Sequence, residues 1–357
     1  MRATRPLISM MFALLIVGIL APAAEAQKGK PQPPPPPPCL TLANPAFAYS
    51  RYVNGQEDLM VMDADGSHQC VLVSQKSTYN TNPDWSPDGK QLVFQVEQQV
   101  RGKLLYFNYK VNVDGTGLTR MQTISRGSSR PGWSPVPLGD KKYKIVYSSK
   151  VILPDGTYGP EKNELWIVDA DGTSDPERLT FDGDVWDWDA DWSPTGDRLA
   201  VDTYDGTVQG LSVYRIGCIE NSGCFATLEG DVLNVDGSPL KGKESVGFDW
   251  AKTQDKIVVG AKTGHGQSGD TFDLWIIDLS DPAHPVQLTD TPDLNETLPT
   301  WSPDDSVIAF RSFPTGGPSS FNTLRSDVTN DRTGGTPLPT QPADPQSVYG
   351  LNWRRNP

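Results

Sequence analysis

Residues 82–94, NPDWSPDGKQLVF, form the unit that decides the fold of this chain. Its Trp-Ser-Pro motif occurs four times, and two degenerate copies lack the serine and proline. The tryptophans of these copies are Trp85, Trp133, Trp192, Trp250, Trp301 and Trp353. Subtracting successive positions gives steps of 48, 59, 58, 51 and 52 residues. Repeats of about this length, each with a tryptophan, indicate a propeller or a solenoid.

Each unit continues in the same way after its tryptophan. A turn such as Asp88-Gly89 precedes a short apolar run, and a second apolar run follows, as in ELWIVDADG at residues 164–172. A shorter run, such as residues 177–180, closes the unit. Short β-branched and aromatic runs between Gly, Pro, Asp and Asn predict strands, and no helical periodicity separates them. Four strands in a unit are the composition of a propeller blade.

The combination of Trp-Ser-Pro-Asp-Gly, an apolar strand and a second strand that ends in Asp-x-Asp-Gly resembles the TolB-type β-propeller, a WD-like repeat family. The resemblance runs from Phe47 to Trp353. It implies an all-β, six-bladed β-propeller of four-stranded antiparallel blades, and a periplasmic interaction scaffold of the cell envelope. This chain departs from the family in one respect, because a proline-rich spacer stands where TolB has an α/β domain. The partners of the TolB complex are therefore not carried over.

The first 44 residues predict export and a spacer. Arg2 and Arg5, an apolar core at residues 7–20 and Ala-Glu-Ala at residues 24–26 are typical of a secretory signal peptide, residues 1–26. An uncleaved anchor is the alternative, but the core is short for a span of roughly 20 residues. Residues 27–44 form a proline-rich linker, interpreted as an extended spacer or as a ligand for a proline-binding groove. We expect an exported protein, periplasmic or secreted, without membrane insertion after cleavage.

The two ends of the domain at residues 45–357 appear as complementary halves of one blade. Residues 46–50 and 59–66 match the second and third strands of a unit but have no tryptophan before them. Trp353 is followed by only four residues. We therefore expect Asn352 and Trp353 to pair with residues 46–50 and close a ring of six blades, which removes two open sheet edges.

Four cysteines in an exported chain indicate two disulfides. Cys218 and Cys224 flank a short stretch at which hairpins of other units turn, so we expect a bond between them. By elimination Cys39 pairs with Cys70. No zinc or redox spacing is present.

Composition excludes several classes of function. A formal net charge of −13 and a pI of about 4.7 argue against nucleic acid and anionic membrane surfaces as partners. The sequence contains no Gly-x-Ser-x-Gly elbow and no His-Glu-x-x-His pair. The Asp-x-Asp-Gly segments lack the further ligands of a helix-loop-helix calcium site and are interpreted as hairpin turns. We expect no catalytic residue, no metal and no cofactor in a monomeric protein.

The densest polar cluster is DGDVWDWDAD at residues 182–191, directly before Trp192. Its five carboxylates and two tryptophans suit a cation or sugar site, with carboxylates as acceptors and indole faces as platforms. The other interpretation is a solvated acidic loop with one tryptophan between blades.

Long, irregular loops are expected on one face of the ring, before the first strand of each blade and between its second and third strands. They cover residues 77–84, 127–132, 151–163, 181–191, 260–272, 290–300 and 313–321. Variable loops on a rigid scaffold are typical of a binding surface. Candidate binding residues on this long-loop face are Tyr79, Arg130, Tyr158, Asp184, Trp186, Asp187, Trp188, Asp189 and Tyr349. We expect a protein partner, with a glycan as the alternative. The rival class is a glycan-directed hydrolase or lyase with carboxylates in the central channel.

Overall fold

The structure is a computed structural model that describes residues 46–355, except 77, 122–129, 153–157, 182, 184, 221, 265–270 and 342–347. The chain divides into two compact units, Met1–Pro35 and Pro36–Pro357, and the described residues all belong to the second. The predicted signal peptide, linker and Cys39 lie outside the described residues.

All regular secondary structure of the described residues is β-strand. Four sheets have four antiparallel strands each. In order across each sheet they are β11 (Glu177–Arg178), β10 (Tyr158–Asp169), β9 (Lys144–Ile152) and β8 (Gly132–Trp133); β12 (Trp186–Trp192), β13 (Arg198–Tyr204), β14 (Gln209–Ile219) and β15 (Gly223–Asp231); β16 (Ser245–Trp250), β17 (Lys256–Lys262), β18 (Phe272–Asp278) and β19 (Val286–Gln287); and β20 (Leu294–Trp301), β21 (Val307–Pro314), β22 (Ser320–Arg325) and β23 (Thr336–Pro337).

The remaining strands form one eight-stranded sheet. Its members are β24 (Val348–Trp353), β1 (Phe47–Val53), β2 (Gln56–Met62), β3 (Cys70–Val73), β4 (Thr78–Trp85), β5 (Gln91–Val100), β6 (Lys103–Asn112) and β7 (Thr119–Arg120). Every pairing in it is antiparallel except that of β2 with β4, a parallel bridge between Glu57 and Tyr79 alone. The prediction of an all-β propeller is therefore confirmed as a propeller-like arrangement of four-stranded sheets. Among the described residues, the separate four-stranded sheets number four, whereas six blades were predicted.

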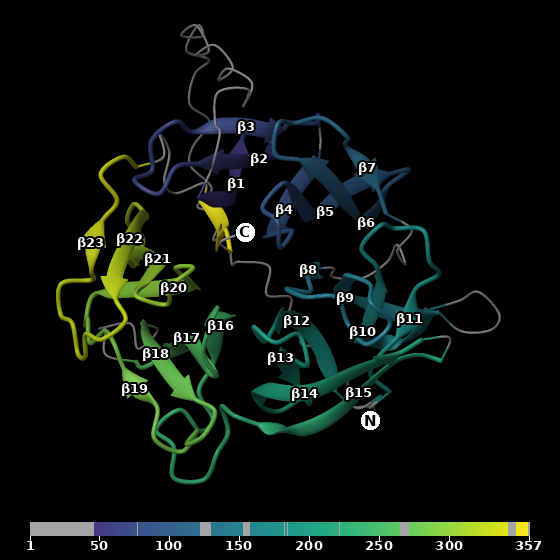
Figure 1. Ribbon diagram of the computed structural model, residues 1–357. Coiled ribbons are helices and arrows are strands. Elements are labelled where there is room, and N and C mark those ends of the chain that lie inside the picture. The colour runs from purple at the N-terminus through teal and green to yellow at the C-terminus, as the bar shows by residue number, and fades with distance from the viewer. Residues whose placement is uncertain are drawn as a thin grey trace, which may run out of the picture. The chain divides into compact units, whose positions relative to one another are not determined.

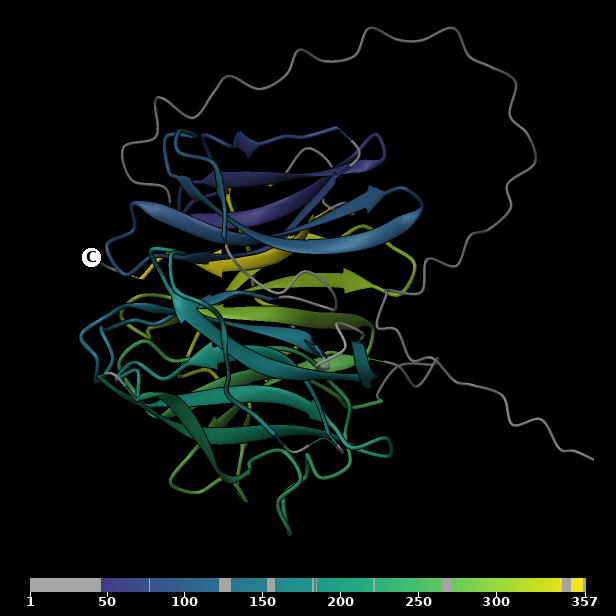
Figure 2. The same cartoon turned by 90° about the vertical axis from the view of Figure 1, so that its right-hand side faces the viewer.

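The sheets are arranged radially around a common centre (Figure 1). Strands β4, β8, β12, β16, β20 and β24 are innermost, and each ends at a repeat tryptophan. The strands run between two opposite faces of the ring (Figure 2). Neighbouring sheets share apolar cores: one cluster contains Ile167 of β10 with Trp192 of β12, and another contains Val213 of β14 with Trp250 of β16. The repeat tryptophans thus fill the space between sheets, as large buried aromatic side chains do.

The predicted pairing of the two ends is confirmed. β24 runs antiparallel to β1, with Phe47 opposite Trp353 and Ala48 opposite Asn352. The rings of Phe47 and Trp353 lie 4.6 Å apart between centroids. The strand that ends at the C-terminal tryptophan is therefore joined to a sheet by strands from the beginning of the domain.

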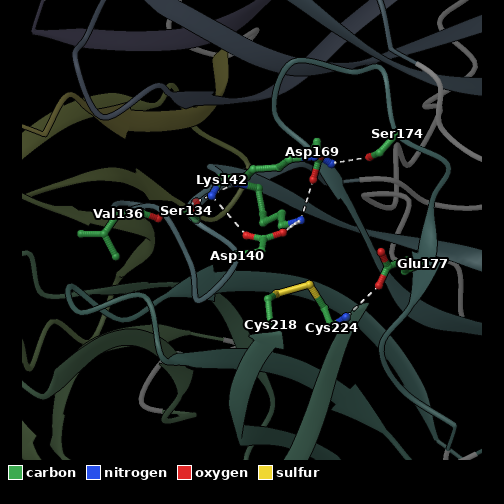
Figure 3. Close-up of a disulfide and its surroundings, with 10 residues drawn as sticks. Ser134, Val136, Asp140, Lys142, Asp169, Ser174, Glu177, Cys218 and Cys224 are labelled. Atoms are coloured by element: carbon green, nitrogen blue, oxygen red, sulfur yellow. Dashed lines mark hydrogen bonds and ion pairs between the residues drawn. A yellow bond between two sulfur atoms is a disulfide. The ribbon is translucent and has the colours of Figure 1, made fainter. Parts of the chain in front are cut away.

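The predicted Cys218–Cys224 disulfide is also confirmed, and it closes the β14–β15 hairpin. Figure 3 shows it beside Glu177, whose carboxylate accepts a 2.7 Å hydrogen bond from the Cys224 N–H. Cys70 is disulfide-bonded as well, while its predicted partner Cys39 lies outside the described residues. A disulfide indicates an oxidising compartment.

Several segments that were predicted as loops are strands. Residues 186–191 belong to β12 and residues 78–84 to β4, and β20 begins at Leu294. The interpretation of residues 182–191 as a solvated acidic loop is therefore wrong for residues 186–191, which belong to β12. The strands are longer because these polar residues pair across the sheet, as Asp187 does with Thr203. In the described part of the chain, no helix is long and apolar enough to cross a membrane.

Candidate functional site

The innermost strands surround a cavity of about 130 Å³ at the centre of the ring. Its lining comes from the short segments directly before the six repeat tryptophans. They are residues 82–84, 130–132, 189–191, 247–249, 298–299 and 350–352. Six segments spread over the whole domain thus meet at one place, although nothing in their local sequence marks a cavity.

A repeated backbone irregularity shapes this lining. The pairing of β4, β12, β16 and β20 with the next strand shifts register within these segments, as at a β-bulge. The third residue before the tryptophan has positive φ at Asn82, Gly247, Leu298 and Gly350. Bulges bend and twist a strand. Gly247 also meets a close neighbour, since a Cβ added there would lie 2.9 Å from the Leu298 backbone. Each bulge therefore brings main chain to the cavity wall.

The residue before each tryptophan connects one sheet to the next. The carboxylates of Asp84, Asp191 and Asp249 each accept a 2.6 Å hydrogen bond from a backbone N–H in the following sheet, donated by Trp133, Trp250 and Trp301 respectively. At the last junction Trp353 donates its N–H to the hydroxyl of Thr300 at 3.1 Å. Hydrogen bonds to charged acceptors are the strong ones, so these contacts fix neighbouring sheets to one another.

Cations balance these carboxylates. Lys252 Nζ lies 2.6 Å from Asp249 Oδ1, and both side chains are buried. Arg355, after the last strand, lies 3.7 Å from Asp191 and donates to the Trp192 carbonyl at 3.4 Å. Burial raises the pKa of Asp249, and repulsion from Asp191 adds to this effect while Lys252 opposes it. Burial likewise raises the pKa of Asp84, against the attraction of Arg355.

Two predicted binding residues meet at the cavity wall. Arg130 and Asp189 form an ion pair, and their side chains are 40% and 17% exposed. The second carboxylate oxygen of Asp189 is buried and accepts no hydrogen bond from a described residue. Nearby on β13, burial raises the pKa of Asp202 to about 6, although Gln209 donates to its carboxylate at 2.8 Å. Charged side chains thus line part of the cavity, beside apolar residues such as Phe248 and Leu298.

Trp186 lies at the beginning of β12, on the long-loop face, and is half-buried. Its ring lies 5.5 Å from that of Tyr204, which is opposite it on β13. The ammonium of Lys162 lies 4.9 Å from the centre of the Trp186 ring, within the range of a cation–π contact. Together Trp186, Tyr204 and Lys162 form an aromatic–cationic cluster at the leading end of the strand.

Asp187 is a structural residue, contrary to its predicted place in a binding surface. Its side chain is fully buried and accepts a hydrogen bond from the Thr180 hydroxyl, while its carbonyl accepts one from Ser148 at 2.7 Å. Both partners belong to the preceding sheet region. A carboxylate that is enclosed in this way holds two sheets together and does not face a partner.

The other predicted residues are spread over the ring. Trp188 is partly exposed on β12, and its indole N–H is buried without an acceptor among the described residues. Tyr79 is partly exposed on β4 and stacks on Tyr52 with 6.3 Å between ring centroids. Tyr158 is the first residue of β10, and Tyr349 is the second residue of β24. The side chains of both, and the whole of Asp184, lie outside the described residues.

Sequence reasoning missed the residues that connect the sheets. Asp84, Asp191 and Asp249 all stand directly before a repeat tryptophan, so an Asp-Trp pattern was visible in the sequence. Tyr204 and Lys162 carried no such signal, because they reach Trp186 only through strand pairing and sheet packing. In the described part of the chain, no group of three His, Cys, Asp or Glu side chains is placed to hold a metal ion.

Comparison with known proteins agrees with this fold. No protein-family model matches the chain. An uncharacterized protein of Agrobacterium fabrum is 27% identical over 161 residues, which are 44% of this chain and 51% of that protein. The chain therefore spans about half the length of this relative.

Two solved structures are similar over most of the chain. TolB from Acinetobacter baumannii has a TM-score of 0.62 at 16% identity, covering 87% of this chain and 67% of that one. A putative TolB from Agrobacterium tumefaciens has a TM-score of 0.54 at 14% identity, covering 87% of this chain and 99% of that one. At such identities the likeness establishes the fold alone. The chain has the fold of a TolB-like β-propeller.

Proposed function

We propose that this protein is an exported interaction scaffold of the cell envelope, which binds a macromolecular partner through the long-loop face of the propeller and performs no chemistry itself. One observation carries the proposal. The structural tryptophan of β12, Trp192, is fully buried between sheets, whereas Trp186 and Trp188 on the same strand remain partly exposed. Partly exposed tryptophans beside a cation are the residue types that anchor protein interfaces.

The scaffold that we infer has six blades. The eight-stranded sheet would consist of two blades, β24-β1-β2-β3 and β4-β5-β6-β7, which touch at the single bridge between Glu57 and Tyr79. Six tryptophan-ended strands around one cavity support this count. A closed ring leaves the leading ends of six strands on one face, where a large partner is able to contact several of them at once.

Export to the periplasm or the outside of the cell is part of the proposal. The signal-like sequence at residues 1–26 and the Cys218–Cys224 disulfide support it. The fold likeness to TolB supports a role in the envelope, with a protein as the partner.

A glycan-directed hydrolase or lyase is the second candidate. The observation in its favour is a group of charged side chains at the cavity, where Asp189 pairs with Arg130 and the nearby Asp202 interacts electrostatically with the same guanidinium. Against it, the carboxylates of Asp84, Asp191 and Asp249 already accept hydrogen bonds from backbone N–H groups and have a structural role.

A pull-down from envelope extract tests the proposal. The mature protein is compared with Trp186→Ala/Trp188→Ala and with Tyr143→Ala, a control that removes a 41%-exposed tyrosine between β8 and β9, away from the long-loop face. We expect one specific partner, identified by mass spectrometry, that the control retains and the double variant loses. Retention by both variants, or turnover of an envelope polysaccharide by the wild type, would refute the proposal.

A further inference from the structure

The outermost strands of the ring differ greatly in length. Strands β7, β11, β19 and β23 have two residues each and β3 has four. β15 has nine residues. Natural proteins keep exposed edge strands short because a long edge is a template for another chain. In the described part of the molecule no strand pairs with the outer side of β15, which lies at the periphery of the ring (Figure 1).

The disulfide defines which backbone groups of β15 point outward. Cys218 and Cys224 are directly opposite each other with Cα atoms 4.0 Å apart. Such a short separation is typical of a pair that does not exchange backbone hydrogen bonds. Accordingly the Cys224 N–H points away from β14 and reaches Glu177. By the alternation of a strand, the N–H and C=O groups of Ala226 and Leu228 also point outward.

Apolar side chains accompany this open edge. Phe225 is 49% exposed and Leu228 is 57% exposed. The Phe225 ring lies over Gly217 on the paired strand, where an added Cβ would come within 2.4 Å of it. The missing side chain of Gly217 thus allows the ring to lie flat on the sheet, close to the edge.

The surroundings of the edge are acidic. Glu177, Glu220, Glu229 and Asp231 lie on or beside β15. Arg215 pairs with Glu229 at 2.5 Å, and Arg198 also interacts electrostatically with Glu229. Against these four carboxylates stand two guanidiniums, so the surroundings of the strand carry an excess of negative charge.

We propose that the outer edge of β15 is a docking site for an extended basic segment of another protein, which adds to the sheet as a further strand. Backbone hydrogen bonds to Ala226 and Leu228 would supply affinity, because the Cys224 N–H is already bonded to Glu177, and side chains would supply specificity. Apolar side chains of the segment contact Phe225 and Leu228, and its lysines or arginines face the carboxylates. This site is separate from the long-loop face and does not depend on the proposed function.

Two other occupants fit the edge poorly. The chain's own linker contains six consecutive prolines, which lack the N–H groups that a ladder needs. A second copy of the chain would bring a second set of the same carboxylates to this acidic edge, and like charges brought close together are destabilising. Charge complementarity therefore favours a basic partner.

The test uses a fluorescent peptide of alternating lysine and valine, about seven residues long, which is a usual strand length. Binding to the mature protein is measured by fluorescence anisotropy. A peptide of the same sequence, N-methylated at alternate residues, keeps the charge but cannot complete the ladder. We expect saturable binding of the first peptide and at least about tenfold weaker binding of the second, because main-chain hydrogen bonds carry this mode.

Variants of the protein complete the test. Ala226→Pro removes an outward N–H and leaves the hydrogen bonds between β15 and β14 in place, as prolines at sheet edges do. Ala226→Ser is the matched control. We expect Ala226→Pro to lose about tenfold in affinity for the lysine–valine peptide and Ala226→Ser to lose little. Equal binding of the methylated peptide, or no saturable binding of either, would overturn the proposal. A wild-type dimer in sedimentation that Ala226→Pro dissociates would overturn it too, since the occupant would be a second copy.

Discussion

Each innermost strand has a leading end, where the strand begins, and a tryptophan end, where it reaches the repeat tryptophan. The contacts at these two ends differ. At the tryptophan ends the same contact recurs: Asp84, Asp191 and Asp249 each accept the N–H of the next repeat tryptophan. At the leading ends each strand is different, with Tyr79 stacked on Tyr52 in β4 and Trp186 against Tyr204 in β12. The uniform end holds the ring together. The variable end has no contact that recurs from strand to strand, although single residues there, such as Asp187, also hold sheets together.

The largest expected effect comes from removing a tryptophan end altogether. Deletion of residues 346–357 removes β24, its ladder with β1 and the carbonyl of Asn352 that accepts the Trp85 indole N–H at 3.3 Å. We expect loss of most of the folding stability, which for a domain is about 5–15 kcal/mol. Thermal unfolding measures it. A truncated protein that melts at the temperature of the intact one would disprove the closing role of β24.

A single tryptophan-end carboxylate has the next largest effect. Asp249→Leu leaves the buried ammonium of Lys252 unpaired and the Trp301 N–H without its acceptor. We expect a loss of about 3 kcal/mol in the free energy of unfolding, measured with urea.

The control for this variant is Asp304→Ala, which removes an exposed carboxylate that accepts from Ser302 and Ser306 in a turn. Its expected loss is about 1 kcal/mol or less, because these hydrogen bonds are exposed to water and contribute little net stability. Equal losses for the two variants would show that the buried carboxylate before Trp250 stabilises the fold no more than an exposed carboxylate in a turn.

The sequence predicted the tryptophan ends well. Trp-Ser-Pro-Asp-Gly specifies a local turn, in which Ser86 donates to Asp88 at 2.7 Å and accepts from the Gln91 N–H, and Gly89 takes positive φ. The predicted closure by Asn352 and Trp353 followed from counting incomplete units. Such features depend on residues near in sequence or on the repeat itself.

The leading ends and the cavity could not be predicted in the same way. Asp187 resembled a solvated loop residue because nothing local shows Thr180 and Ser148 enclosing it. The Arg130–Asp189 ion pair joins residues 59 positions apart, one in the segment before β8 and the other in β12. Long-range packing decides which polar residue is exposed, and one sequence does not display that packing.

At the leading end the expected effect is on binding rather than on folding. Trp186→Ala/Trp188→Ala removes two half-buried aromatic rings and leaves the buried Trp192 in place. We expect the affinity for the captured partner to fall by about 2 kcal/mol, the size that defines an interface hot spot, with cooperative unfolding retained. Isothermal titration calorimetry measures the affinity, and circular dichroism measures the thermal unfolding. Unfolding of the double variant would place both tryptophans in the core.

The smallest expected effect is a pH dependence at the leading end of β2. Burial, with repulsion from Glu97, raises the pKa of Glu57 from 4.5 to about 7. A raised folded-state pKa means that the folded protein holds the proton more tightly. The stability that this group contributes is therefore present below pH 4.5 and is lost as the pH rises to about 7.

Glu57→Gln tests this dependence, because the amide does not titrate. We expect the variant to gain about 1 kcal/mol relative to the wild type between pH 5 and pH 8, less than the full pKa difference implies because solvent reaches part of the side chain. Urea unfolding at both pH values measures it. A constant difference between the two proteins at all pH values would show that Glu57 is not a buried acid.

Hydrogen–deuterium exchange of the complex with the captured partner tests the central claim most directly, because it compares the two ends in one experiment. The account predicts slower exchange on binding at residues 185–189 and 203–209, the leading end of β12 and the turn beside Tyr204. It predicts no change at the turns after the tryptophans, such as residues 86–90 and 302–306. Protection confined to those turns would contradict a binding surface on the long-loop face.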